Sequence, residues 1–517
     1  MTTDIPSPGR VVIVGGGTAG WLAAAYLSLT LKIRNVTLVE SREIGIIGVG
    51  EGTFPTIRST LAGLGISEAE FLVRADATFK QGVLFEGWGT GSDSYFHPFN
   101  MPVGGEDEAL LPHWIADDSP QRPAWADAVT VQEQVIRAGR APKRPSDPDF
   151  SGPMNYAYHF DAARFAEYLR DISVASGVER IEGTVATVER GCDGDITALV
   201  LGDGRRAEGE FFLDCSGFRA LLIGQTLGAG FTSCADTLFN DRALAMQVPY
   251  ASPQSAVRPY TLATAHDAGW TWDIGLSERR GIGYVYSSRH CSDDEAEATL
   301  RRYVGAEGDN LTPRQLRFET GYRETQWIGN CAAVGLSAGF FEPLESTGIM
   351  LIEAALKMIG EFLVPGDRSA RNAAARSFNR LMSGRFERIV NFLKLHYCIS
   401  GRTDTPYWRD NVSPASIPEA LRDMLAQWRY RPPSRFDFVV DFETFLPPSY
   451  HYILYGMGFE TQLSGGVDRY LGAADARDVF NRVRAAHSGA KGGLPDHRAL
   501  LNHYHGLPAA APHKVSQ

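Results

Sequence analysis

The segment Val11-Val12-Ile13-Val14-Gly15-Gly16-Gly17-Thr18-Ala19-Gly20 decides the fold of this chain. Its apolar residues predict a buried strand, its glycines a tight turn, and the residues from Trp21 to Leu31 an amphipathic helix. A second predicted strand runs from Val36 to Val39 and is followed by Glu40. Strand, helix and strand in this order make a βαβ unit, which predicts an α/β fold.

The glycine spacing in this unit matches the G-x-G-x-x-G fingerprint of dinucleotide-binding proteins. Gly15 permits the tight turn, Gly17 lets backbone N–H groups approach a pyrophosphate, and Gly20 allows the helix to pack closely on the strand. The acidic residue expected about 20 residues later is present as Glu40, which would accept hydrogen bonds from the ribose. The predicted cofactor contacts in this unit are Gly15, Gly17, Thr18, Ala19, Gly20 and Glu40.

The composition argues against several other classes of protein. Lys and Arg number 50 against 61 Asp and Glu, a net charge of −11 without long runs of one sign, so nucleic acid is not expected as a partner. No apolar run reaches the roughly 18 to 20 residues of a membrane span, and the apolar N-terminal run leads into glycines rather than a signal-peptide cleavage site. The six cysteines are scattered, so we expect a reduced, cytoplasmic chain without a metal site.

Two further segments favour FAD over a nicotinamide as the dinucleotide. Gly48 to Pro55 is a second glycine-rich turn, and Phe211 to Asp214 is an apolar strand that ends in an acidic residue. A nicotinamide enzyme with a Rossmann fold would need neither segment. The predicted flavin contacts here are Gly48, Val49, Gly50, Glu51, Val185 and Asp214.

The length of 517 residues exceeds what one core usually supports, so we expect two or three subdomains. Residues 1–87 and 155–350 are predicted to form a FAD-binding, Rossmann-like module with mixed sheets. Residues 88–154 are rich in Gly, Pro, Asp and aromatics and are predicted to be a loop-rich insertion near the substrate. Residues 351–485 are predicted to be a mostly helical substrate-side subdomain, and residues 486–517 a loosely held tail.

The segment Gly269-Trp270-Thr271-Trp272-Asp273-Ile274 is the most specific feature of the chain, because tryptophans at i and i+2 point to the same side of a strand. It closely resembles the Gly-Trp-x-Trp-x-Ile-Pro signature of flavin-dependent halogenases of the tryptophan halogenase family, with Gly275 in place of the proline. The resemblance implies that Trp270 and Trp272 form a barrier near the flavin that prevents direct hydroxylation of the substrate. At Gly275 we expect a looser turn, because glycine does not fix φ. The turn from Gly48 to Pro55 likewise resembles the flavin-contacting strap of these enzymes.

The segment Gly335 to Ile349 carries the strongest resemblance to this family. It reads Gly-Leu-Ser-Ala-Gly-Phe-Phe-Glu-Pro-Leu-Glu-Ser-Thr-Gly-Ile and matches the part that joins the flavin site to the substrate site. Pro343 is expected to end the preceding element, and Ser346 or Thr347 to cap a helix. Free N–H groups in the first turn of that helix would form an anion site.

The resemblance assigns specific roles within this segment. It implies that chloride or bromide binds at Thr347 and Gly348 and that Leu336 and Ile349 contact the flavin. It also implies a catalytic carboxylate at Glu345. Without the resemblance, Glu345 would be an ordinary first-turn acidic residue that favours the helix dipole.

Lys80 lies in the segment Ala77-Thr78-Phe79-Lys80-Gln81-Gly82, where small and apolar neighbours suggest a partly buried ammonium. From the residues alone, a surface lysine with a buried stem is the ordinary alternative. The segment resembles the Phe-Lys-x-Gly element of the family. The resemblance implies that Lys80 hydrogen-bonds hypohalous acid, or is chlorinated by it, and delivers the halogen to an aromatic ring.

Candidate substrate contacts come from two regions. The triplet His97-Pro98-Phe99 resembles the element that sandwiches indole in tryptophan halogenases, although a loop packing its own aromatics is an alternative. Near the C-terminus, Tyr450-His451 takes the place of the Tyr-Tyr pair that holds the carboxylate of the amino acid, and Phe459 follows it. Together with Gly275, this difference favours free indoles or related aromatics, with tryptophan itself as the alternative substrate.

The resemblance implies a two-component enzyme. A separate flavin reductase would supply reduced FAD, because the chain has one dinucleotide fingerprint and no evident site for NADH. Reduced FAD would react with O2 to a C4a-hydroperoxide, and halide attack on it would give hypohalous acid. Lys80 would pass the halogen to a small aromatic substrate, and Glu345 would bind the electrophile or accept the ring proton.

Two other functions stay open at the level of sequence. An FAD monooxygenase that hydroxylates an aromatic ring would share the nucleotide site but would need neither a halide nor Lys80. A flavin-binding regulatory protein would need no catalytic residue. The sequence also leaves a homodimer open.

Overall fold

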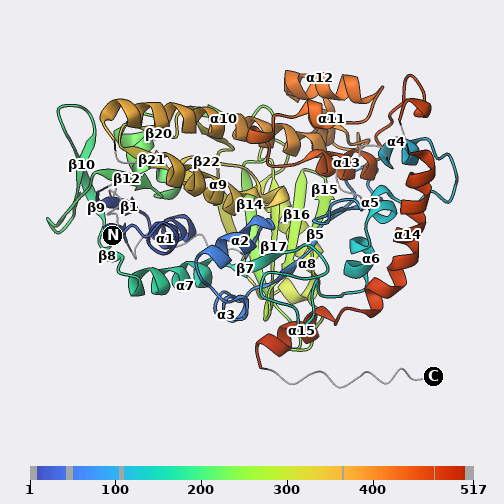
Figure 1. Cartoon of the computed structure of the whole chain (residues 1–517), viewed down its shortest axis with the longest axis horizontal. Helices are drawn as coiled ribbons and strands as arrows, with labels where there is room; N and C mark the ends of the chain where they lie inside the picture. The colour runs from blue at the N-terminus through green and yellow to red at the C-terminus, as the bar shows by residue number, and fades with distance from the viewer. Residues whose placement is uncertain (1–8, 42–49, 104–109, 364–365, 471, 507–517) are drawn as a thin grey trace, which may run out of the picture. The chain divides into compact units, whose positions relative to one another are not determined.

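The computed structural model describes residues 9–41, 50–103, 110–363, 366–470 and 472–506 (Figure 1). The chain divides into two compact units, each built from segments that are far apart in the sequence. The first unit comprises Met1–Ala75, Phe160–Cys234 and Glu319–Glu387. The second comprises Asp76–His159, Ala235–Phe318 and Arg388–Gln517. Each unit has a sheet and a hydrophobic core of its own.

A six-stranded sheet with the order β20-β21-β12-β1-β2-β8 forms the centre of the first unit. Its neighbouring strands are parallel except β20 and β21, which are antiparallel. Both faces of a parallel sheet are usually covered, and all four residues of β1 are buried, which is why β1 is an unbroken apolar run. The bounds are β1 (Val11–Val14), β2 (Val36–Glu40), β8 (Glu179–Glu182), β12 (Phe211–Asp214), β20 (Trp327–Ile328) and β21 (Cys331–Ala333).

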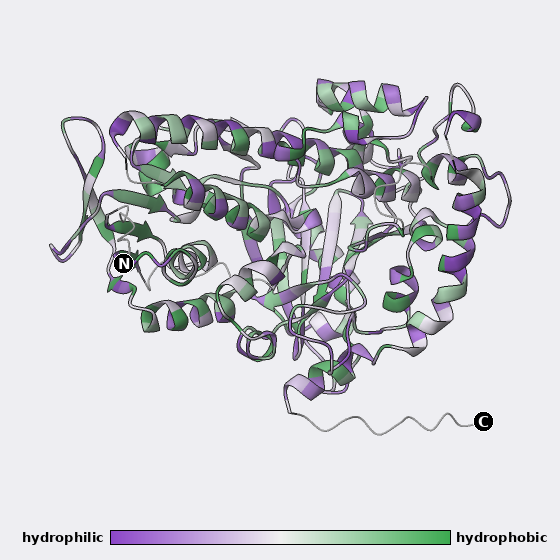
Figure 2. Ribbon diagram, in the orientation of Figure 1, coloured by the Kyte–Doolittle hydropathy of each residue, from purple (hydrophilic) through white to green (hydrophobic). Residues whose placement is uncertain are grey.

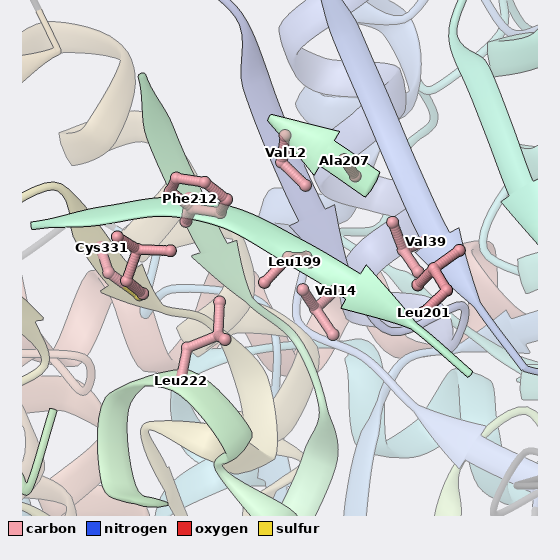
Figure 3. Close-up of a cluster of buried hydrophobic side chains, with 10 residues drawn as sticks. Val12, Val14, Val39, Leu199, Leu201, Ala207, Phe212, Leu222 and Cys331 are labelled. Atoms are coloured by element: carbon pink, nitrogen blue, oxygen red, sulfur yellow. The ribbon is translucent and has the colours of Figure 1, made fainter. Parts of the chain in front are cut away.

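A smaller antiparallel sheet packs its apolar side chains against this sheet. It consists of β9 (Val185–Arg190), β10 (Ile196–Leu201) and β11 (Arg206–Glu208). Figure 3 shows Leu199 and Leu201 of this sheet beside Val12, Val39 and Phe212 of the large one. All five side chains are almost fully buried, so the two sheets share one core.

The helices of the first unit follow the predicted pattern. The helix predicted from Trp21 to Leu31 is present as α1 (Thr18–Ala25), which continues as a π-helical turn, η1 (Tyr26–Thr30). The others are α2 (Thr56–Gly63), α3 (Glu68–Arg74), α7 (Ala162–Ala175) and α9 (Thr347–Phe362). The unit boundary falls inside the long helix α10 (Arg368–Cys398). Short strands complete the unit: β3 (Gly50–Gly52), β13 (Phe231–Ser233), β19 (Gly321–Arg323) and β22 (Gly339–Phe340).

A seven-stranded sheet with the order β18-β14-β17-β16-β15-β5-β6 forms the centre of the second unit. Its strands are antiparallel except β15 and β5, which are parallel. The bounds are β5 (Gly82–Glu86), β6 (Ser94–Pro98), β14 (Arg242–Pro249), β15 (Thr261–His266), β16 (Gly269–Gly275), β17 (Arg279–Tyr286) and β18 (Arg314–Arg317). Two further strands, β4 (Thr78–Lys80) and β7 (Ala157–Asp161), form an antiparallel pair.

Helices of the second unit are mostly short. They are α4 (Leu110–Ile115), α5 (Trp125–Val129), α6 (Gln132–Arg137), α8 (Asp293–Val304), α11 (Pro406–Val412), α12 (Glu419–Trp428), α13 (Pro447–Gly456), α14 (Ala473–Gly492) and α15 (His497–Tyr504). Hydrophilic and hydrophobic residues alternate along α14 (Figure 2), and Ala476 and Val483 on it are buried. This is the pattern of a helix with one covered face.

The observed units differ from the predicted domains in several respects, one of which is that residues 351–387, predicted to belong to the substrate-side subdomain, lie in the first unit. Residues 76–87, 155–159 and 235–318, predicted to belong to the FAD-binding module, lie in the second unit. The reason is strand pairing: β14 to β17 form one sheet with β5 and β6 rather than extending the sheet around β1. The predicted loose tail from residue 486 is instead the end of α14 and all of α15, and residues 507–517 lie outside the described part of the chain.

His497 holds the start of α15 in the second unit. Its Nε2 accepts a hydrogen bond from the Phe79 N–H at 3.2 Å, and its Nδ1 donates to the Val257 carbonyl at 2.9 Å. The two bonds together require a neutral ring, because a protonated Nε2 cannot accept a hydrogen bond. Burial lowers the pKa of His497 to about 4, and burial also lowers the pKa of His451 to about 4.

We therefore expect the melting temperature to fall as the pH drops from about 6.5 to 4. The unfolded histidines take up protons near pH 6.5, whereas the folded ones do so near pH 4, so the stability present above pH 6.5 is lost across this window. The variant His497→Gln keeps an acceptor and a donor but does not titrate, so its melting temperature should depend less steeply on pH. Equal slopes in calorimetric melts of the two proteins would contradict this role of His497.

Candidate active site

The glycines of the fingerprint fit a bound dinucleotide. Gly15 has φ +114°, and a Cβ on it would lie 2.1 Å from the Cys215 carbonyl oxygen. A Cβ on Gly20 would lie 1.8 Å from the Gly15 carbonyl oxygen, so α1 and β1 pack too closely for a side chain. A Cβ on Gly17, by contrast, would meet no atom within 4 Å. The turn is closed on the protein side and open on the side where a pyrophosphate would bind.

Glu40 at the end of β2 is held by two side chains. Its Oε2 accepts a hydrogen bond from Trp21 Nε1 at 3.2 Å, and its Oε1 accepts from Arg180 Nε at 2.6 Å. A carboxylate has about four acceptor positions, so positions remain for ribose hydroxyls. A Cβ on Gly16 would overlap the Glu40 carboxylate, which explains why the turn has a glycine here in addition to the three of the fingerprint.

Asp214 organises the turn after β12. One of its carboxylate oxygens accepts from the N–H and hydroxyl of Ser216, and the other accepts from the N–H groups of Leu222 and Ile223. Its backbone carbonyl accepts a hydrogen bond from the Ser337 hydroxyl. The sequence did not reveal this structural use of the side chain. Direct contact between Asp214 and the cofactor stays a prediction.

The segment Gly335 to Ile349 lies beside the fingerprint in the first unit. A Cβ on Gly335 would be 2.8 Å from the Cβ of Ala19, so no larger residue fits where the two segments meet. Leu336 follows in a short 3-10 turn, η5 (Gly335–Ser337), and Ile349 is buried in α9. The structure thus brings together the two segments that were predicted to contact the flavin.

Glu345 precedes α9 rather than lying in its first turn. It ends the 3-10 turn η6 (Pro343–Glu345), with 1% of its surface exposed. Ser346 follows at φ +57° and ψ +40° and forms no side-chain cap, so the predicted serine cap is wrong. The physical reason is that a capping residue needs an extended conformation to direct its oxygen at the helix N–H groups.

At the start of α9, the space beside its second residue, Gly348, contains no atoms of the described residues. Thr347 is 1% exposed, whereas a Cβ on Gly348 would meet no atom within 4 Å. The N–H groups of a first helical turn attract anions. This geometry suits the predicted halide site at Thr347 and Gly348.

Lys80 is fully buried on β4 in the second unit. Its Nζ lies 5.2 Å from the centroid of the Phe99 ring, so the structure brings together a predicted catalytic residue and a predicted substrate contact. In the pairing of β4 with β7, Lys80 lies opposite Ala157 and Thr78 opposite His159. Residues diagonal in such a pair are within reach of a long side chain.

His159 was not singled out by its sequence context. It is fully buried, its Nε2 lies 2.8 Å from Thr261 Oγ1, and its Nδ1 has no hydrogen-bond partner among the described residues. Burial, and then the charge of Lys80, lowers the pKa of His159 well below its ordinary value. The surroundings of Lys80 therefore include a neutral imidazole.

Trp270 and Trp272 lie on β16 and touch each other, with ring centroids 6.4 Å apart. Trp88, which the sequence did not single out, lies 6.3 Å from Trp270 and donates from Nε1 to the Ala263 carbonyl at 3.0 Å. A Cβ on Gly283 would lie 2.1 Å from the ring of Trp272, so that indole lies flat over the next strand. The paired indoles are therefore a tightly packed wall.

Gly275 does not loosen the strand as predicted. It is buried and paired with Arg280 at the end of β16, and its carbonyl accepts from the Thr78 hydroxyl. A Cβ on Gly275 would lie 2.7 Å from Val257 Cγ1 and 2.8 Å from the Tyr250 hydroxyl. Glycine is required here because neighbouring side chains occupy the space of its missing Cβ.

The predicted substrate residues fall into two groups. His97 and Tyr450 both pack against Phe392 of α10, with centroid distances of 6.2 and 4.8 Å. His451 lies elsewhere, with its Nε2 3.0 Å from the Pro433 carbonyl, because consecutive helix residues point in different directions. Phe459 lies after α13 and is half-buried. The sequence missed Phe392, which comes from a distant helix.

The remaining predicted cofactor contacts are Gly48, Val49, Gly50, Glu51 and Val185. Gly48 and Val49 lie outside the described residues, and Gly50 and Glu51 form most of β3. Burial raises the pKa of Glu51 to about 7. Val185 opens β9 and packs against the core of the first unit.

The structure shows neither a metal site nor a membrane span in the part of the chain that it describes. Within those residues, no three His, Cys, Asp or Glu side chains are placed to hold a metal ion. No helix among them combines the length and the hydropathy that a membrane span requires.

A dinucleotide turn, a wall of paired indoles and a buried lysine are the features of a flavin-dependent halogenase. The chain belongs to the tryptophan halogenase family, whose model matches residues 10–470. It is therefore an enzyme with an α/β FAD-binding fold that uses reduced FAD, O2 and a halide. The predicted fold class, family and cofactors are confirmed.

Individual relatives support this assignment over nearly the whole chain. It is 36% identical to the tryptophan 6-halogenase SttH of Streptomyces toxytricini over 472 residues, 87% of this chain and 90% of that protein. A solved tryptophan halogenase from Shewanella frigidimarina matches with a TM-score of 0.90 at 38% identity, over 96% of this chain and 98% of that one. BrvH, a flavin-dependent halogenase from Brevundimonas, matches with a TM-score of 0.84 at 35% identity, over 96% and 99%.

The variant Gly348→Ala tests the predicted halide site. Its methyl group meets no protein atom within 4 Å, and alanine is the better helix former, so the melting temperature should not fall. The methyl would enter the space predicted for the halide, so the KM for bromide should rise about tenfold or more, a loss of roughly 1.4 kcal/mol.

The matched control is Gly489→Ala in α14, where a Cβ also meets nothing within 4 Å. It should leave the KM for bromide unchanged. If both variants keep the KM of the parent enzyme, the halide does not bind at the start of α9.

Proposed function

We propose that this enzyme halogenates a free indole or a related electron-rich aromatic, and that Lys80 carries the electrophilic halogen. The observation that supports this most directly is the fully buried Lys80 ammonium 5.2 Å from the Phe99 ring centroid. Taking an ammonium out of water is costly, so a lysine held beside an aromatic ring argues for use in the reaction. The loop-rich insertion 88–154, with Phe99, would lie on the substrate side.

The proposed chemistry divides between the cofactor and the chain. FAD, delivered in reduced form by a separate reductase, supplies with O2 the oxidising equivalents that convert halide to hypohalous acid. Thr347 and Gly348 hold the halide through N–H groups at the start of α9. Trp270 and Trp272 keep the aromatic substrate away from the flavin, so that ring hydroxylation does not compete.

Lys80 handles the halogen in the proposed mechanism. Its neutral amine attacks the halogen of hypohalous acid; an N–halogen bond forms, the halogen–oxygen bond breaks, and the amine proton leaves with the oxygen as water. The aromatic ring then attacks the halogen, the N–halogen bond breaks, and the Lys80 nitrogen takes up a proton from water to become the amine again. The ring gives up its own proton, which Glu345 accepts as a general base.

The variant Lys80→Met tests this role while keeping much of the side-chain volume. We expect the rate at which halogenated product forms to fall more than a hundredfold, because a positioned catalytic side chain contributes about 10² or more to a rate. Oxygen consumption and hypohalous acid formation should continue, since both precede the step at Lys80. Product is measured by mass spectrometry and hypohalous acid with a chemical trap.

Lys143→Met is the matched control for this experiment. Lys143 is also fully buried in the second unit, with its Nζ 6.0 Å from the Tyr156 ring centroid, and it donates to the Pro148 carbonyl at 2.7 Å. This variant should still halogenate. Product formation in Lys80→Met at the rate of the parent enzyme would overturn the assigned role.

A substrate panel tests the proposed substrate class and the need for a reductase. With a flavin reductase, NADH, FAD and bromide or chloride, we expect indole to be halogenated with a higher kcat/KM than tryptophan. Omitting the reductase should abolish turnover, and FAD reduced chemically should restore it. A higher kcat/KM for tryptophan would support the alternative substrate, and hydroxylated product alone would support a monooxygenase. The cytoplasmic location and a homodimer stay predictions from the sequence.

A further inference from the structure

A buried carboxylate that the proposed chemistry does not use links two elements of the first unit. Glu353 on α9 is 4% exposed. Its Oε2 accepts a hydrogen bond from Thr56 Oγ1 at 2.8 Å, and its Oε1 accepts a short one from the Thr60 hydroxyl. Because Thr56 and Thr60 are one turn apart on α2, each carboxylate oxygen has its own hydroxyl donor.

The two linked helices lead directly to the proposed flavin and halide contacts. Thr56 begins α2 immediately after the segment Gly50 to Pro55, which continues the proposed flavin strap. Glu353 lies about two helical turns after Thr347, where α9 begins at the proposed halide site. The bonds of Glu353 therefore join a helix that follows the strap to the helix that presents the halide.

The cost of burying the Glu353 carboxylate indicates that its hydrogen bonds position α2 and α9 relative to each other and do not only stabilise the fold. Burial raises the pKa of Glu353, while the hydroxyl bonds of Thr60 and Thr56 lower it, so removing the carboxylate from water is only partly offset. An apolar residue at this place would contact α2 without that cost, because Ile57 and Leu61 of α2 are already buried. Two hydrogen bonds, unlike apolar contacts, are directional and fix the rotation of one helix about the other.

We infer that Glu353 is a positioning residue that sets the start of α9, and with it the halide site, relative to the flavin strap. The inference rests on the proposed halide role of Thr347 and Gly348. Glu353 touches neither halide nor flavin in this account; it acts through the two threonines.

The variant Thr60→Val removes one hydroxyl at nearly constant volume and is the main test. We expect the KM for bromide in hypobromous acid formation to rise about tenfold, as for the loss of one buried hydrogen bond, with kcat at saturating bromide nearly unchanged. A second measurement does not depend on turnover. The bromide-induced rise in the melting temperature of the protein with oxidised FAD should be lost, relative to methanesulfonate at equal ionic strength.

Conservative variants separate positioning from a merely structural role. Thr60→Ser keeps both hydrogen bonds. In Glu353→Gln the amide oxygen can accept from one threonine hydroxyl while the amide N–H donates to the other. Both variants should retain the KM and the bromide-induced shift of the parent enzyme, whereas Glu353→Leu should behave like Thr60→Val. Thr30→Val is the control: Thr30 Oγ1 donates to the Gly63 carbonyl at the other end of α2, at 3.2 Å, and its loss should leave the KM unchanged.

Two outcomes would overturn the inference in distinguishable ways. If Thr60→Val lowers the melting temperature but leaves both bromide readouts unchanged while Gly348→Ala raises the KM, Glu353 only stabilises the fold. If neither Thr60→Val nor Gly348→Ala changes either readout, the halide site itself is misplaced. Should Glu353→Leu fail to fold, Thr60→Val and Thr60→Ser still decide between these outcomes.

Discussion

The close approach of backbone to backbone at the glycine turn is the constraint on which the first unit depends. Gly15 and Gly20 leave no room for a side chain between β1, α1 and the residue after β12. Gly335 brings a third segment against Ala19 in the same way. Because the contacts at Gly15 and Gly20 are with backbone atoms, they fix where the N–H groups of the turn point. The open space at Gly17 is the consequence, and it is what a pyrophosphate requires.

Buried charge is the second organising feature, and each unit contains its own. Lys80 in the second unit and Glu345 and Glu353 in the first are all nearly inaccessible to water. Burial of this kind destabilises a fold unless the surroundings compensate, and Glu353 shows part of that compensation, with one hydroxyl on each oxygen. An enzyme that keeps such groups gives up stability for defined chemistry or defined geometry. In our proposals Lys80 is buried for its chemistry, and Glu353 is buried because it positions two helices.

Local patterns in the sequence predicted the features that depend on local geometry. The turn at Gly15 follows from spacing alone, and Trp270 and Trp272 share a face because strand residues alternate. Features set by distant segments were not predictable in this way. His159 lies near Lys80 but on another strand, and Phe392 packs against Tyr450 from another helix. Nothing in the sequence around His159 or Phe392 predicts these contacts. The same reason explains the domain boundaries, since β15 joins the sheet of the second unit to β5, a strand more than a hundred residues earlier in the chain.

The packing of the indole wall bears on the reaction class. Trp270 is fully buried against Trp88, and Trp272 lies over the bare backbone of Gly283. Neither ring can turn aside without displacing a neighbour, because a packed interior leaves no spare volume. A wall that cannot open would exclude an aromatic substrate at all times, rather than only in one conformation. Direct hydroxylation would then fail for steric reasons, and an oxidant as small as hypohalous acid would have to carry the halogen onward, as the proposed role of Lys80 requires.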